Sequence, residues 1–181
     1  MGDRTDQDLI RAVLAGDTEA YAGLVRRYRD RYGRFAVRML GDIDDAEEAL
    51  QDAFVRAYRS LARCEHPERF DVWFYRILAN RCRTTGGRRG RRERTFVRDE
   101  NALDRAAAPD VVDRLIWREE LERALGALDD DQREAFLLKH VENRSYEEIA
   151  QLTGAGISAL KMRVKRACDR MRGILVEVDD V

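Results

Sequence analysis

The sequence predicts an all-α protein made of two small helical domains joined by a linker. Apolar residues recur at helical spacing through most of the 181 residues, which is the pattern of amphipathic helices. Only two prolines occur, Pro67 and Pro109, so long helices are allowed almost everywhere and a many-stranded β protein is disfavoured. The composition, 44% hydrophobic and 38% charged, is typical of a folded, helix-rich chain.

Three apolar stripes predict the helices of a first domain, residues 1–87. The stripes lie within residues 21–40, 46–61 and 70–78. The last of them is formed by Phe70, Phe74, Ile77 and Leu78. Three helices can bury such stripes against one another, which gives a small bundle. We expect this bundle to end near Gly86-Gly87, because glycine weakens a helix interior.

The start of the second of these helices is acidic. Asp44 is followed three residues later by Glu47, which resembles a capping pair for that helix. The acidic side chains, with no positive charge among them, are Asp42, Asp44, Asp45, Glu47, Glu48 and Asp52. Carboxylates suit the dipole at a helix N-terminus, and they also offer a face to a basic protein partner. Helix capping and solubility remain the alternative explanation.

Residues 88–112 lack helical periodicity and predict an exposed linker. The segment is first rich in arginine, then acidic, and then reads AAAP, as expected between two domains. We expect its arginines to strengthen DNA or polymerase contact without specifying sequence. Helical periodicity returns in residues 113–181, which form the second predicted domain. Its apolar positions are Leu115, Ile116, Leu121, Leu125 and Leu128 on one expected helix and Phe136, Leu137, Leu138 and Val141 on the next. There Asp129 with Gln132 can cap a helix.

The second domain contains the pattern of a helix-turn-helix. Ser145 and Glu148 have capping-box spacing, which predicts that Ser145 starts a short helix. Gly154 and Gly156 follow where a tight turn between helices needs unusual backbone angles. A longer helix then begins near residue 157. The positions that should face inward on it are Leu160, Val164, Ala167 and Met171.

The opposite face of this longer helix is basic. Its outward side chains, with one lysine on the flank, are Ser158, Met162, Lys165, Arg166 and Lys161. A DNA major groove accepts such a helix, and phosphates on its rims attract lysine and arginine. A basic amphipathic helix can also be only a solvated face. The capping box, the glycine turn and the basic front together favour DNA binding.

A second candidate surface for nucleic acid lies in the first domain. Four side chains recur on one side of the helix after Pro67, namely Trp73, Arg76, Asn80 and Arg83. An aromatic ring among cations and an amide can stack unpaired bases and hold phosphates. The polar loop RCEHPERFD, which starts at Arg63, precedes this helix. The alternative is that Trp73 packs in the core and the arginines are merely solvated.

Catalysis and metal binding find little support in the sequence. The three cysteines are far apart, no C-x-x-C occurs, and only two histidines are present. Cys64-Glu65-His66 is a candidate for metal ligands, but zinc sites draw on clustered pairs and no second pair is visible. We therefore expect no enzyme activity, no cofactor and no metal. No stretch stays apolar for the ~18 residues of a membrane span, and we expect a cytoplasmic protein.

Four segments resemble a known family in order and spacing. They read DLIRAVLAGDTEAYAGLVRRY, DIDDAEEALQDAFVRAYRSL, FDVWFYRILANRCR and DQREAFLLKHVENRSYEEIAQLTGAGISALKMRVKRA. Together they look like the two conserved regions of the group IV, or extracytoplasmic-function (ECF), sigma factors of bacterial RNA polymerase, in the sigma-70 family. The resemblance implies a promoter-specificity subunit with a region 2 domain and a region 4 domain. Phosphodiester chemistry would stay with the polymerase.

The resemblance implies a partner for each surface. Core RNA polymerase would bind the acidic helix through the clamp helices of its largest subunit, at Asp45, Glu48, Gln51 and Asp52. The −10 element would be read and melted by Arg63, Trp73, Arg76, Asn80 and Arg83. The helix-turn-helix would lie in the major groove of the −35 element, while its domain binds the β flap. Many relatives are held by an anti-sigma factor, which the resemblance admits here too.

The chain departs from the family in one segment, and it also fits one alternative function. Where the family often continues the −10-reading helix, this chain has CRTTGGRRG, which should end the helix early. The alternative function is a helix-turn-helix transcription regulator that binds DNA without polymerase. Such proteins usually dimerise on paired half-sites, and we see no separate dimerisation segment in the sequence.

Overall fold

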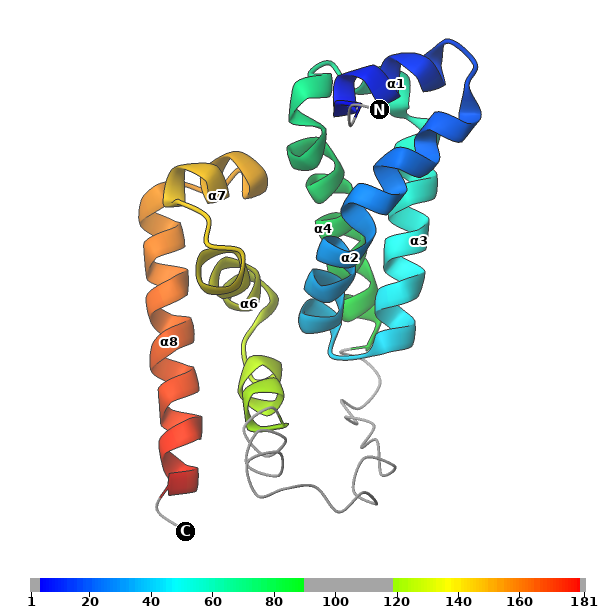
Figure 1. Cartoon of the computed structure of the whole chain (residues 1–181). Coiled ribbons are helices and arrows are strands. Elements are labelled where there is room, and N and C mark those ends of the chain that lie inside the picture. The colour runs from blue at the N-terminus through cyan, green and yellow to red at the C-terminus, as the bar shows by residue number, and fades with distance from the viewer. Residues whose placement is uncertain (1–3, 90–118, 180–181) are drawn as a thin grey trace. The chain divides into compact units, whose positions relative to one another are not determined.

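The computed structural model describes residues 4–89 and 119–179, and Figure 1 shows their helices. No strand occurs within those two ranges. The described chain divides into two compact units, one formed mainly before the undescribed internal segment and one mainly after it. The predicted all-α class with two helical domains is confirmed. The predicted linker, apart from its first two residues, lies outside the described residues, as do Leu115 and Ile116 of the second domain's apolar pattern.

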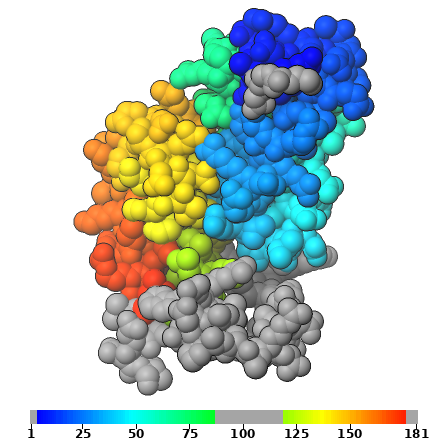
Figure 2. Space-filling view, in the orientation of Figure 1, coloured from blue at the N-terminus to red at the C-terminus, as the bar shows by residue number. Residues whose placement is uncertain are grey.

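The first unit is a bundle of three long helices preceded by a short one. These helices are α1 (Asp6–Leu14), α2 (Tyr21–Leu40), α3 (Ile43–Arg59) and α4 (Phe70–Arg89). Short 3-10 turns lie at Thr18–Ala20, Leu61–Arg63 and Pro67–Arg69. The α3 helix packs against both α2 and α4. In Figure 2 the residues of α2, in blue, form much of the visible surface of this unit.

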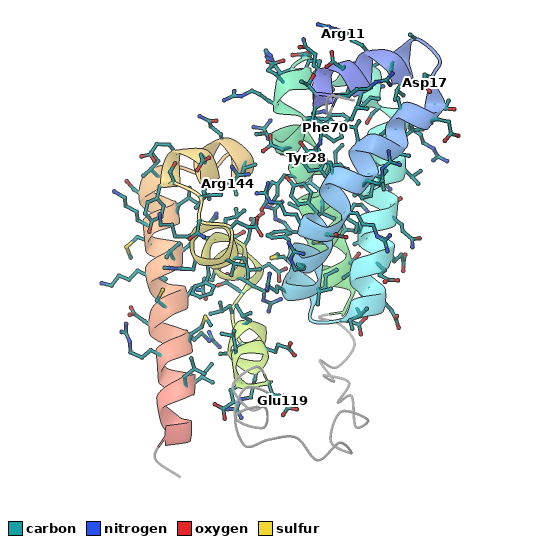
Figure 3. All side chains as sticks on the ribbon, in the orientation of Figure 1. Arg11, Asp17, Tyr28, Phe70, Glu119 and Arg144 are labelled. Atoms are coloured by element: carbon teal, nitrogen blue, oxygen red, sulfur yellow. The ribbon has the colours of Figure 1, made fainter. Side chains whose placement is uncertain are left out.

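Aromatic rings from three helices fill the core of the first unit. Phe74 is fully buried, and its ring stacks on that of Phe54 with centroids 4.4 Å apart. The rings of Tyr28 and Phe70 lie 5.4 Å apart, where α2 meets α4 (Figure 3). Buried aromatic residues of this size dominate the energetics of a core. The first unit therefore depends on ring packing.

One position of the predicted stripe on α4 is wrong. Ile77 is only half-buried, whereas Tyr75 is 1% exposed. The cause is the position of α2, because the Tyr75 ring packs against that of Phe35 with centroids 5.3 Å apart. The buried face of α4 is therefore turned toward α2.

Two helix boundaries in the first unit also differ from prediction. Asp42, and not Asp44, caps α3 by accepting a hydrogen bond from the backbone N–H of Asp45 at 2.9 Å. Gly41 ends α2 in the left-handed region at φ 69°, and this leaves Asp42 in the extended conformation of an N-cap. At the other end, α4 continues through both glycines to Arg89. A glycine costs a helix only about 1 kcal/mol, so the pair does not end it.

The second unit is built around a helix-turn-helix. Residues 119–126 are helical, and α6 (Asp130–Phe136) follows with a π-helical turn at Leu137–Val141. Then come α7 (Tyr146–Thr153) and α8 (Ile157–Asp179). The α6 helix packs against α8. The core is mostly aliphatic, and its fully buried side chains include Leu128, Leu137, Leu138, Ile149 and Leu160.

Most of the predicted apolar pattern of the second unit is confirmed. The four inward positions of α8 are all buried, and Asp129 caps α6 by accepting from the backbone N–H of Gln132 at 2.8 Å. Leu121 and Val141, expected on apolar stripes, are exposed. Arg133 was not predicted as a core residue. It is buried, and its guanidinium donates to the carbonyls of Leu125 and Leu128, which the end of the preceding helix leaves open.

Candidate nucleic-acid and protein interfaces

The α7–α8 motif has the local geometry that its sequence predicts. The Ser145 hydroxyl accepts from the backbone N–H of Glu148, and the Glu148 carboxylate accepts from the backbone N–H of Ser145 at 2.7 Å, so the capping box is complete. Gly154 ends α7 with a φ of 75°, where a Cβ would be strained. Gly156 has no positive φ. The expectation of unusual backbone angles therefore holds for the first glycine only.

The outward face of α8 is exposed as predicted. The five residues of this face, which we call the α8 row, are Ser158, Lys161, Met162, Lys165 and Arg166, and each is exposed. Arg163 is different, because its guanidinium pairs with the Asp131 carboxylate of α6 at 2.5 Å and fixes α8 to the unit. The α8 row thus presents three cations on a helix whose opposite side is held in the core.

Lys161 is held at the start of α7 by an aromatic ring. Its Nζ lies 5.7 Å from the centroid of the Tyr146 ring, and Nζ of Lys139 lies 4.9 Å from the same centroid. Such cation–π contacts are attractive. The Glu147 carboxylate accepts a hydrogen bond from the backbone N–H of the same residue, and this bond lowers its pKa. The Ser145 hydroxyl and the charges of Lys161 and Lys139 lower the pKa further. The sequence did not reveal this cluster, because Lys139 reaches it from a π-helical turn.

On α4, the four predicted residues do share one side of the helix. Arg76 and Asn80 are exposed, while Trp73 and Arg83 are half-buried. The Trp73 ring lies 5.8 Å from that of Phe70, so one part of the indole packs on the core and another part remains open. Arg83 donates to the Asn80 amide oxygen at 3.1 Å. We call these four residues the α4 row.

The loop before α4 has an exposed basic residue and no metal centre among the described residues. Arg63 is exposed at the end of a 3-10 turn. Cys64 is buried, and desolvation by burial raises the pKa of its thiol. His66 is exposed and its Nδ1 lies 3.1 Å from a carboxylate oxygen of Glu68. Within residues 4–89 and 119–179, no three potential ligands come together as a metal site.

On α3, the predicted polymerase-binding residues point away from the buried stripe. Glu48 and Gln51 are exposed, and Asp45 and Asp52 are half-buried. Asp52 accepts a hydrogen bond from Arg56 at 2.8 Å and forms an ion pair with Arg81 of α4. The hydrogen bond from Arg56, with the charges of Arg81 and Arg56, lowers the pKa of the Asp52 carboxyl. Asp52 therefore joins α3 to α4, and Glu48 and Gln51 form the exposed part of this face.

Comparison with known proteins agrees with both units. The family model described as Sigma-70 region 2 matches residues 24–92, and the one described as Sigma-70, region 4 matches residues 118–171. The RNA polymerase sigma factor CarQ of Myxococcus xanthus is 34% identical over 164 residues, which cover 91% of this chain and 94% of that protein. The chain belongs to the ECF group of the sigma-70 family. The sigma-70 family consists of transcription initiation factors and not of known enzymes.

Other members of the family are similar over nearly the whole chain. The RNA polymerase sigma-H factor of Pseudomonas aeruginosa is 30% identical over 175 residues, covering 90% of this chain and 89% of its own length. The ECF RNA polymerase sigma-E factor of Escherichia coli K12 is 31% identical over 175 residues, with 90% of each chain covered. This sigma factor thus matches its relatives through both domains.

Two solved structures of complexes also resemble the chain. CnrH, in complex with the cytosolic domain of CnrY, has a TM-score of 0.70 and 26% identity over 95% of this chain and 97% of that one. The sigma factor RpoE of Bartonella quintana, in complex with the anti-sigma factor NepR, has a TM-score of 0.64 and 25% identity, with 86% and 96% covered. None of the helices described in this sigma factor has both the length and the apolar character required to cross a bilayer.

Proposed function

We propose that this ECF sigma factor binds core RNA polymerase, directs it to promoters with −35 and −10 elements, and helps to melt the DNA. The main support is that each unit carries a row of cationic and polar side chains, exposed or half-buried, opposite a buried stripe. The α8 row belongs to a helix-turn-helix whose first helix begins with a complete capping box. The α4 row combines an indole, an amide and two guanidinium groups. Phosphodiester chemistry remains with the polymerase, and the chain acts where the polymerase is, in the cytoplasm.

At the −35 element, α8 enters the major groove. That groove is about 12 Å wide and admits one helix. Lys165, Arg166 and Ser158 present the donors that reach base edges, and Met162 offers an apolar contact. Lys161, held on the Tyr146 ring, lies to one side where a groove rim brings phosphates. The domain that contains the helix-turn-helix also binds the β flap of the polymerase.

At the −10 element, the α4 row holds an unpaired strand. The open part of the Trp73 ring provides a platform on which a base can stack. Asn80 offers both a donor and an acceptor to a base edge, and its contact with Arg83 fixes the two side chains relative to each other. Arg76 and Arg83 neutralise phosphates, and Arg63 contributes from the loop.

Core polymerase binds the acidic face of α3. Glu48 and Gln51 form the exposed part, with Asp45 beside them, and the clamp helices of the largest subunit supply the basic partner. Asp52 has a second role, because its ion pair with Arg81 connects the polymerase-binding helix to the −10-reading helix. Docking and base reading therefore take place on one packed body.

An anti-sigma factor is a further proposed partner. The two similar solved structures are complexes, one with the cytosolic domain of CnrY and one with the anti-sigma factor NepR. The extensive similarity of this chain to both sigma factors supports a protein inhibitor of the same kind here.

Transcription with purified components tests the function. Core polymerase with this chain should produce transcripts from discrete start sites on a promoter library, and core alone should not. Lack of promoter-specific initiation would contradict the proposal. Tight footprints by the isolated chain on paired half-sites, without polymerase, would instead support a self-sufficient helix-turn-helix regulator.

A further inference from the structure

The α2 helix is strongly basic, in a chain with a formal net charge of −1. It contains six arginines and one aspartate. Four of the arginines recur at alternating spacings of four and three residues, which places them on one flank of the helix. They form the α2 arginine row, Arg27, Arg31, Arg34 and Arg38. At 1.5 Å per residue the row is about 16 Å long. The function proposed above does not use it.

The two ends of the row differ in their contacts. Arg27 is anchored by an ion pair with Asp6 and by donating to the Arg4 carbonyl at 2.6 Å. The guanidinium of Arg31 lies 5.4 Å from the centroid of the Tyr32 ring. These contacts fix the N-terminal end of the row.

Arg34 and Arg38, at the other end, are exposed. Within residues 4–89 and 119–179 neither side chain takes part in a hydrogen bond or ion pair. Asp30, one turn before Arg34, is the only acidic residue of α2 and is also exposed. One carboxylate cannot neutralise both guanidinium groups, so this end of the helix keeps a net positive charge. The C-terminal end of the row therefore presents cations to a partner.

Helix packing shows which surface the row borders. On α2, Phe35 meets Tyr75 of α4, whereas Gly33 lies against Leu50 of α3. Arg31 and Arg38 are four residues before and three residues after Phe35. They therefore lie on the Phe35 side of the helix, which faces α4 and not α3.

The α4 helix shows the matching arrangement. Its Phe74 stacks on Phe54 of α3, while Tyr75 faces α2. Arg76 and Arg83 follow Tyr75 around the circumference of α4, on the side away from α3. The α2 and α4 helices run parallel, since Tyr28 contacts Phe70 and Phe35, two turns later, contacts Tyr75. The α2 arginine row and the α4 row therefore border one outer surface of the first unit.

We propose that the α2 arginine row binds the phosphate backbone of the unpaired promoter strand whose bases the α4 row reads. This inference rests on the proposed function. Guanidinium groups form bidentate, charge-assisted hydrogen bonds with phosphate. The exposed end of the row, from Arg34 to Arg38, spans about 6 Å along the helix, which is enough for two consecutive phosphates, since stacked DNA has one about every 3.4 Å along each strand. The row thus adds affinity and direction to the strand, and base choice stays with α4.

The test compares two double variants of the full chain in complex with core polymerase. Arg34→Gln/Arg38→Gln removes the two exposed charges of the row. Arg26→Gln/Arg29→Gln removes two exposed charges from other flanks of the same helix and is the matched control. Binding is measured against salt concentration on two DNAs. One is a promoter with a pre-opened −10 region, and the other is the fully paired upstream part of that promoter, without the −10 region.

Arg34→Gln/Arg38→Gln should make the negative slope of log affinity against log salt shallower by about 1.4 on the pre-opened promoter, because each single-strand phosphate contact contributes about 0.7 to its steepness. The slope on the paired fragment and the preference among −10 sequences should not change, and the control should resemble the wild type. Equal effects in both double variants, or equal effects on both DNAs, would overturn the inference.

A weaker affinity for core polymerase itself, with unchanged DNA binding, would also overturn it and would identify an acidic protein surface as the partner. Core affinity is therefore measured separately for each variant. If the wild-type holoenzyme binds neither DNA, the proposed function fails. If the wild type binds both and only the predicted difference is missing, the inference alone fails.

Discussion

The α4 and α8 helices present similar cations but differ in what surrounds them. The α4 row includes a half-buried indole and lies over a core of stacked rings. The α8 row has no aromatic side chain, and the buried positions opposite it are Leu160, Val164, Ala167 and Met171. Both helices are fixed by ion pairs to neighbours, α4 through Asp52 and Arg81 and α8 through Asp131 and Arg163.

This difference matches two forms of DNA. Unpaired bases expose their faces, on which an indole can stack. Paired bases expose only their edges in a groove, where lysine, arginine and hydroxyl groups make the contacts. Two basic helices in one chain can therefore serve a melted and a paired element, and aromatic content distinguishes them.

Removal of the central ring of the first unit should have the largest effect. Phe74→Ala should lower the free energy of unfolding of this unit by about 3–5 kcal/mol, because it leaves a cavity among buried rings. Denaturant unfolding of the full chain measures the change, and Phe74→Leu, which keeps most of the volume, is the matched control. A loss below about 1 kcal/mol would show that ring packing does not hold the unit together.

Loss of the indole should weaken binding to melted DNA specifically. Trp73→Ala should reduce holoenzyme affinity for a promoter with a pre-opened −10 region by about 1–3 kcal/mol, the usual value of one base stacked on an aromatic side chain. Trp73→Phe should retain part of the affinity. An equal loss on a paired −35 fragment would contradict the division between the two helices.

Loss of an outward cation of α8 should act on paired DNA. Lys165→Ala and Arg166→Ala should each weaken binding to a −35 duplex by about 1–3 kcal/mol if the side chain reads a base, with relaxed preference at one position. Arg172→Ala, further along the same helix, where Arg172 pairs with Asp169, is the control. Unchanged sequence preference in both test variants would mean that the wrong face of α8 has been assigned.

The smallest expected effect concerns the start of the helix-turn-helix. Ser145→Ala should lower the free energy of unfolding of the second unit by about 1 kcal/mol, because the N–H of Glu148 loses its acceptor. The substitution should act through stability, and affinity for DNA in the folded range should remain near that of the wild type. Thermal unfolding and duplex binding measured on the same sample would separate the two, and a large loss of affinity without a loss of stability would argue against it.

The same capping box predicts a pH dependence. Hydrogen bonds from the Ser145 backbone N–H and from Arg144 hold the pKa of the Glu148 carboxyl below its usual range. A depressed pKa in the folded state means that its stabilisation is present above the unfolded-state pKa and is lost as the pH falls through the folded-state value. Glu148→Gln should therefore flatten the acid side of the stability profile of the second unit, as followed by unfolding at a series of pH values.

The helices and most of their buried faces could be predicted from sequence because apolar periodicity specifies a buried side. Predictions failed where a neighbouring helix decided the outcome, as at Tyr75, which α2 covers, or where two candidates for a cap were adjacent, as at Asp42 and Asp44. The paired glycines predict a helix end that does not occur, since α4 continues to Arg89.

The candidate site was predictable to a similar extent. Residues of the α4 and α8 rows lie on single helices, so spacing alone placed them together. Contacts between elements had no such signal. The pair Asp52–Arg81, the buried Arg133 and the two lysines on Tyr146 each join side chains whose proximity depends on packing or on a π-helical turn. The DNA contacts of the α4 and α8 rows and the polymerase contacts of α3 remain predictions.

The central claim is that α4 selects the melted −10 element and α8 selects the paired −35 element. Sequencing of transcripts from a randomised promoter library, made by holoenzymes with the wild-type chain, Asn80→Ala or Lys165→Ala, tests this division between the two helices. We expect Asn80→Ala to alter base preference only in the −10 element and Lys165→Ala only in the −35 element. Altered preference in the opposite element, or in both elements for either variant, would contradict it.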